Sequence, residues 1–116
     1  MSSADQVIDE LAANAKPDDL PRVDRQFADK LARLEADGGG PAEMVDRLRV
    51  MWQMLKAPDD VVPWGSKAQI MAAMTYFASP IDLVPDILGK LGYVDDAVVV
   101  RVVWQRIQPA VERFQR

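Results

Sequence analysis

The chain has 116 residues and a formal net charge of −4, with 49% hydrophobic and 28% charged residues, which is the balance of one globular domain. It contains no cysteine and no histidine, which excludes disulfides, thiolate metal sites, cysteine nucleophiles and histidine general bases. The acidic balance argues against nucleic acid as a partner, because nucleic-acid surfaces require clustered positive charge.

Residues 1–57 show the apolar spacing of amphipathic helices. A short helix of about ten residues is predicted around Val7, Ile8, Leu11 and Ala12. A second is expected to follow the N-cap Asp19, with its apolar stripe at Leu20, Val23, Phe27, Leu31 and Leu34. Gly38 to Pro41 should end this helix and open a third, whose buried face is predicted to hold Met44, Val45, Leu48, Met51, Trp52 and Leu55.

The second half of the chain predicts two further long helices. One begins near Pro63-Trp64 and runs to about Ala78, and its nearly all-round apolar interior is typical of a central core helix. The other opens at Asp95-Asp96 and runs to about Arg113; the β-branched run 98–103 is a competing strand signal, but a lone strand would have no partner. We therefore predict an all-α fold with 1–116 as a single helical domain, a bundle of five or six helices with a Pro/Gly/Asp-rich bend between the last two long ones.

The bend carries an unusual motif. It reads Ser79-Pro80-Ile81-Asp82-Leu83-Val84-Pro85-Asp86 and then Leu91-Gly92-Tyr93-Val94-Asp95-Asp96, with Tyr76 and Lys67 upstream. Over residues 62–103 the chain resembles the YkvA-like domain-of-unknown-function family. The resemblance implies a helical hairpin around the motif and no particular activity. Some relatives place this hairpin beside or within membrane segments, but the charged residues of this hairpin, among them Lys67, Lys90 and Arg101, argue against a membrane span here.

The polar residues of the motif have a structural interpretation. Ser79 is expected to cap a helix that Pro80 begins, Asp82 to reach its free N–H groups, and Asp95 or Asp96 to cap the last helix. Tyr76 is expected to pack its ring against the core with its hydroxyl at a polar edge.

The same bend also admits an electrostatic interpretation. If Asp82, Asp86, Asp95 and Asp96 converge, their repulsion must be offset. Arg101 or Lys67 would do this through an ion-pair network, in which we expect Arg101 to reach a buried or half-buried carboxylate. The alternative is a metal site at these four aspartates, for which the ions would be Mg²⁺ or Ca²⁺; otherwise no cofactor is expected.

These patterns favour a non-catalytic helical interaction or scaffold module over an enzyme. Its partner would be a protein or a second copy, bound through the N-terminal helices. One alternative is a divalent-metal-dependent enzyme built on the carboxylate cluster, and a second is a peripheral membrane-associated protein. The longest uncharged stretch, 68–81, is too short for a transmembrane span, so we expect a cytoplasmic protein. The sequence leaves open whether the first helix packs on the domain.

Overall fold

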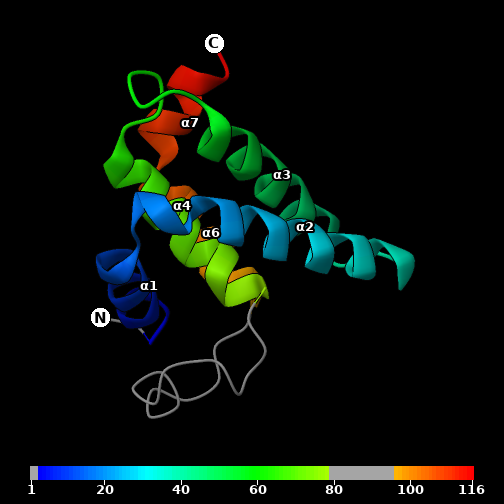
Figure 1. Cartoon of the computed structure of the whole chain (residues 1–116). Helices are drawn as coiled ribbons and strands as arrows, with labels where there is room; N and C mark the ends of the chain where they lie inside the picture. Colours follow the sequence, from blue (N-terminus) through cyan, green and yellow to red (C-terminus); the bar gives the residue numbers. More distant parts are fainter. Residues whose placement is uncertain (1–2, 79–95) are drawn as a thin grey trace.

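The computed structural model describes residues 3–78 and 96–116, and these ranges are helical (Figure 1). Six α-helices and one 3-10 turn occur in them: α1 (Ser3–Asn14), η1 (Pro17–Asp19), α2 (Leu20–Ala36), α3 (Ala42–Lys56), α4 (Trp64–Ala78), α6 (Asp96–Arg106) and α7 (Gln108–Phe114). The prediction of an all-α fold is thereby confirmed. The predicted bend falls on residues 79–95, outside the described residues.

The central helix of the fold is α4, as predicted. It contacts α1, α2, α3 and α6, and Figure 1 shows it running through the middle of the molecule. Its buried side chains point to every side of the helix: Lys67, Ala68, Ile70, Met71, Ala72, Ala73, Met74 and Phe77. A helix that is apolar nearly all round is stable only when other helices cover it, which explains why the chain wraps α4.

The two amphipathic helices α2 and α3 supply much of that cover. Val23, Phe27 and Leu31 are the buried residues of α2. The Phe27 ring lies edge-on to Trp52 of α3, with centroids 5.2 Å apart, and 5.7 Å from the ring of Phe77 in α4. Three helices therefore meet around one aromatic cluster, and the sequence periodicity had placed two of its members, Phe27 and Trp52, on the apolar faces of their helices.

Glycines end α2 in the way that the sequence indicates. Gly38 and Gly39 have φ values of 103° and 77°, in the left-handed region that favours glycine. The Gly38 N–H donates to the carbonyl of Glu35 at 3.2 Å, and the Gly39 N–H to that of Leu34 at 2.8 Å. These two bonds form a Schellman motif, which satisfies carbonyls that the helix end leaves free and reverses the chain toward α3.

The prediction of one last helix to about Arg113 is wrong, because the helix is broken. α6 ends at Arg106, Ile107 leaves helical geometry with ψ at 12°, and α7 starts at Gln108. Pro109 is the cause, since proline has no N–H to continue the ladder and its ring crowds the preceding turn. At the second position of a new helix the same residue is favourable.

The first helix packs on the domain, which settles the question that the sequence left open. α1 lies against α4 and α6. Ala4, Val7 and Ile8 are at most 4% exposed and belong to the same hydrophobic core as the other helices. In the described ranges the core is therefore continuous from α1 to α7.

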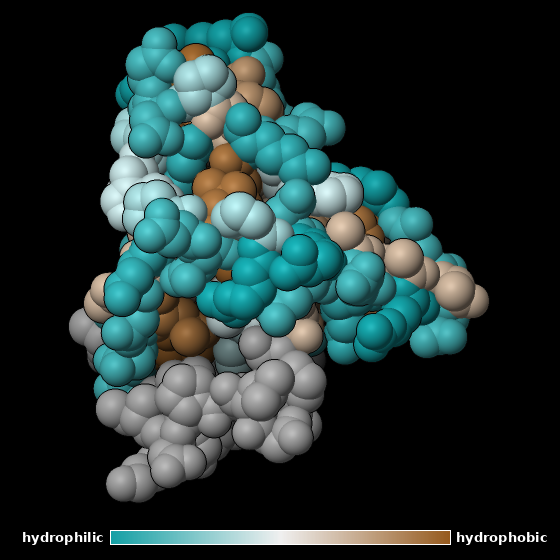
Figure 2. All heavy atoms as spheres, in the orientation of Figure 1, coloured by the Kyte–Doolittle hydropathy of each residue, from teal (hydrophilic) through white to brown (hydrophobic). Residues whose placement is uncertain are grey.

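The outside of the described ranges is mostly polar. Figure 2 shows a largely hydrophilic face in which strongly hydrophobic residues are visible only in recesses. Within the described ranges, the large hydrophobic residue that is exposed at the surface is Val61, with an exposed fraction of 39%. None of their helices combines the length and apolar character needed to cross a bilayer.

Candidate functional site

The residues predicted for the site divide between two parts of the chain. Lys67, Tyr76, Asp96 and Arg101 are described by the structure. Ser79, Asp82, Asp86 and Asp95 lie outside the described residues, so the convergence of the four aspartates, with or without a metal ion, stays a prediction. In the described ranges no group of three or more carboxylates is arranged to hold a metal ion.

Lys67 is a buried cation with partners of its own. Its side chain is 5% exposed, and its Nζ donates to the backbone carbonyl of Ala57 and, at 2.7 Å, to Oδ1 of Asp59. Both partners belong to the connection between α3 and α4. Among the described residues Lys67 thus pairs with Asp59, and its expected pairing with aspartates of the bend stays a prediction. Lys67 lies near the start of α4, and Ala78 at its end is about 16 Å further along the axis.

Tyr76 and Asp96 lie at one end of the helix pair formed by α4 and α6. Tyr76 is half-buried in the last turn of α4 and packs against the core. Asp96 is half-buried and is the first residue of α6, where a carboxylate complements the helix dipole. Figure 1 shows that α4 ends and α6 begins on the same side of the molecule. Two of the predicted site residues are therefore near the ends of helices that the sequence motif connects.

The expected pairing of Arg101 with a carboxylate of the bend involves residues outside the described ones and stays a prediction. Arg101 itself is exposed on α6, and no ion pair to it occurs among the described residues. The reason is its helical position: Val99, Val100 and Val103 take the buried face of α6. The apolar residues beside Arg101 in the sequence therefore do not surround its guanidinium in space.

Arg101 lies instead at a groove between α3 and α6. The groove has a volume of about 150 Å³. From α6 it is lined by Ala97, Val98 and Arg101. From α3 and the residue before it, the groove is lined by Pro41, Glu43, Met44 and Arg47.

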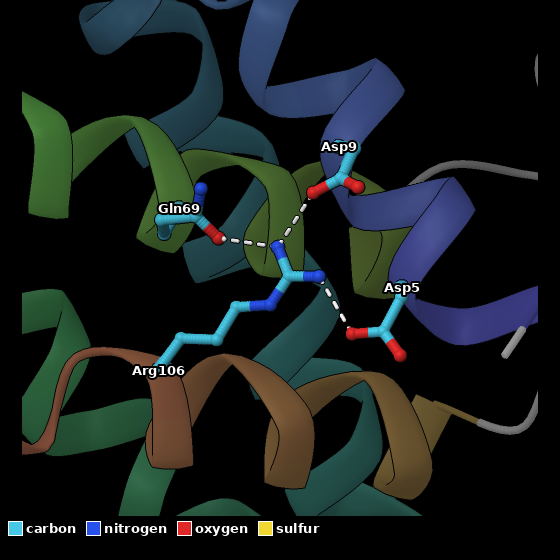
Figure 3. Close-up of polar contacts among 4 residues, drawn as sticks. All are labelled: Asp5, Asp9, Gln69 and Arg106. Carbon is cyan, nitrogen blue, oxygen red and sulfur yellow. Dashed lines mark hydrogen bonds and ion pairs between the residues drawn. The ribbon is translucent and has the colours of Figure 1, made fainter. Parts of the chain in front are cut away.

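Sequence reasoning missed the polar cluster around Arg106 (Figure 3). The Arg106 guanidinium donates to Asp9 at 2.7 Å and to Asp5 at 2.6 Å, both in α1, and to the Gln69 side-chain oxygen of α4 at 3.1 Å. One side chain thereby joins three helices. The one available signal was the spacing of Asp5 and Asp9, four residues apart and so on one face of a helix.

Two opposed effects act on the charge of Arg106. Partial burial by itself would lower the pKa of the Arg106 guanidinium, but the hydrogen bonds to Asp5 and Asp9 and their negative charge together raise this pKa above its ordinary value. Arg106 is therefore a permanent cation. It is suited to holding helices together and unsuited to transferring protons near neutrality.

The segment that carries the motif matches a known family. Residues 66–101 match a family described as "Protein of unknown function (DUF1232)", and this range covers most of α4 and the first half of α6. The resemblance indicated by the sequence is confirmed: this segment is similar to a YkvA-like domain of unknown function.

The chain is also similar to one particular protein. The chain is 32% identical over 47 residues to the "Uncharacterized membrane protein YkvA" of Bacillus subtilis (strain 168). The aligned part is 40% of this chain and 44% of the relative, so less than half of either protein is compared. No solved structure matches the chain significantly.

The relative overturns the expectation of a cytoplasmic protein. YkvA is described as a membrane protein, whereas no helix in the described ranges of this chain could span a bilayer. The expectation rested on the absence of a span in the sequence, and a protein that associates with a membrane in another way does not need one.

Proposed function

We propose that the chain is a non-catalytic helical module that binds a protein partner. Its helices form a scaffold around α4, and the side chains that remain exposed provide the binding surface. The N-terminal helices α2 and α3 offer the larger part of that surface, because both carry long polar faces on the outside of the domain.

The observation that supports this proposal is how two cationic side chains, Lys67 of α4 and Arg106 of α6, are bound. We call them the two shielded cations. Lys67 is bound to the connection before α4, and Arg106 is bound to α1 and α4. Each cation is held by groups of other elements, in contacts that fix the relative positions of helices. Groups engaged in this way stabilise a scaffold and are poorly placed to react with a substrate.

Crosslinking in cells tests the proposal. A photoreactive phenylalanine at Gln26 of α2 or Gln53 of α3, both exposed, should give a discrete adduct with a partner protein or a second copy of the chain. The same residue at Ile8, which is buried, is the control and should give none. Absence of adducts at every exposed position, together with a monomer in light scattering, would contradict the proposal.

A thermal measurement separates the proposal from a metal-dependent enzyme. Millimolar Mg²⁺ or Ca²⁺ should leave the Tm nearly unchanged, because a scaffold has no site for either ion. A ligand that binds only the folded state raises the Tm, so an increase of several degrees would favour an enzyme built on Asp82, Asp86, Asp95 and Asp96.

A peripheral membrane role is the second candidate, and the relative described as a membrane protein favours it. It predicts that the chain floats with vesicles in a density gradient. Vesicles of phosphatidylcholine alone and vesicles mixed with phosphatidylglycerol distinguish apolar insertion from charge attraction. Flotation without a protein adduct would favour this candidate over the first.

A further inference from the structure

The groove between α3 and α6 is lined by both apolar side chains and arginines. Met44 and Val98 contribute apolar surface from facing helices, and Arg47 and Arg101 contribute the positive charges. The family match ends at residue 101, so the α6 wall belongs to the matched segment and the α3 wall does not. Any selectivity contributed by α3 would accordingly come from outside the matched segment.

The two arginines of the groove differ in their partners. Arg47 is 2.6 Å from the carboxylate of Glu43, and its guanidinium lies 5.8 Å from the centroid of the Trp104 ring. Arg101 is exposed and has no ion pair within the described ranges. The groove therefore holds one neutralised guanidinium and one available for an incoming anion.

We propose that this groove binds a carboxylate side chain, Asp or Glu flanked by apolar residues, of the protein partner. This inference rests on the proposed function and names the chemistry that the partner must present. A guanidinium recognises a carboxylate through two parallel hydrogen bonds, and Met44 offers a flexible apolar surface beside it.

Size and charge favour a protein side chain over other anions. A volume of about 150 Å³ is small beside the roughly 300–1,000 Å³ of small-molecule pockets, so it suits one or two side chains. The net charge of −4 repels an anionic membrane as a whole, whereas a single carboxylate in contact with Arg101 feels mainly the local charge.

The test uses a defined peptide and the full chain. The probe is the blocked pentapeptide acetyl-Ala-Leu-Glu-Leu-Ala-amide, with the Gln peptide as its neutral counterpart. In a titration followed by amide NMR, the Glu peptide should shift the amide resonances of residues in both groove walls. The Gln peptide should leave these resonances unchanged. Arg101→Ala should weaken binding by up to about fivefold, as loss of an exposed ion pair would, while Arg113→Ala at an exposed position of α7 should not weaken it.

A second pair of variants gives an effect of opposite sign. Glu43→Gln frees Arg47 from its partner and should tighten binding of the Glu peptide. Glu112→Gln, at an exposed position of α7, changes the net charge by the same amount as Glu43→Gln. It should tighten binding of the Glu peptide less than Glu43→Gln does.

Three outcomes would overturn the inference: no shift in the groove, equal shifts with the Gln peptide, or shifts caused only by phosphatidylglycerol vesicles. If crosslinking captures a partner and Arg101→Ala leaves that adduct unchanged, the groove is excluded while the interaction function stands.

Discussion

At the scale of single residues, the two shielded cations hold the fold together in different ways. Lys67 is almost fully buried while the Asp59 carboxylate that it binds is 75% exposed. Arg106 is 26% exposed, but three acceptors from two helices surround its guanidinium. The first side chain fixes a local connection and the second joins distant parts of the chain, so their removal should have different consequences.

Arg106→Ala should lower the free energy of unfolding by about 1–3 kcal/mol, because Asp5 and Asp9 would both lose their hydrogen bonds from the Arg106 guanidinium. Urea denaturation measures the loss, and Arg113→Ala at an exposed position should cost less than about 0.5 kcal/mol.

The stabilisation by Arg106 should not depend on pH near neutrality. A pKa that is raised in the folded state contributes stability below the unfolded pKa, and this stability is lost only as the pH rises through the folded pKa. Both lie far above neutrality, so the difference between variant and parent should stay constant from neutral to mildly alkaline pH.

Lys67 and Asp59 should show strong coupling. Asp59→Asn removes the negative charge beside the buried ammonium and should cost about 1 kcal/mol, a value reduced by the exposure of Asp59. In a Lys67→Met background, which keeps an apolar side chain of similar length, the same change should cost almost nothing. Equal costs in the two backgrounds, measured by chemical denaturation, would mean that the ion pair does not stabilise the connection.

At the scale of elements, helix ends were predictable wherever glycine or proline marks them. The structure confirms the predicted end of α2 at Gly38 to Pro41 and the predicted start of α4 near Pro63-Trp64. It also confirms that α4 runs to Ala78. Pro109 is an equally clear signal for a helix break, but the apolar spacing of the valines and Ile107 favoured one continuous helix. Asp19 precedes α2 as predicted but makes no side-chain capping bond, and its carboxylate lies 3.5 Å from Arg22 instead. Position is therefore easier to infer than the particular bond.

Gly38→Ala should destabilise the chain by about 1 kcal/mol. No atom lies within 4 Å of the added methyl group, so the cost comes from its φ of 103°. Gly65→Ala is the matched control: it also meets open space, but it lies in α4 without a positive φ and should be neutral or slightly stabilising. Thermal denaturation compares the two. A loss at both positions would show that the turn conformation is not responsible.

At the scale of the whole molecule, periodicity predicts the core and leaves the polar partners undetermined. The apolar stripes of residues 1–57 correctly indicate which faces are buried, because burial depends on spacing along one helix. The partners of Lys67, Arg101 and Arg106 depend on how whole helices are placed against one another. A sequence that offers 14 cations and 18 carboxylates allows many pairings, and only packing selects among them.

The place of α1 in the core gives a test at this scale. Ile8 is fully buried, so Ile8→Ala should lower the free energy of unfolding by about 2–4 kcal/mol through lost burial and a residual cavity. Gln6→Ala, on the exposed face of the same helix, should change it by less than about 0.5 kcal/mol. If Ile8→Ala were as mild as Gln6→Ala in urea denaturation, α1 would be an accessory to the domain.

The bonds from Arg106 to Asp5 and Asp9 also set an order of events during protein synthesis. The bonded residues are 101 and 97 positions apart in the sequence, so α1 leaves the ribosome well before the helix that carries Arg106. Until then the apolar face of α1 has no completed site to cover it. A nascent chain stalled before residue 106 should accordingly leave Ile8 open to protease or chaperone, and release of the full chain should close it.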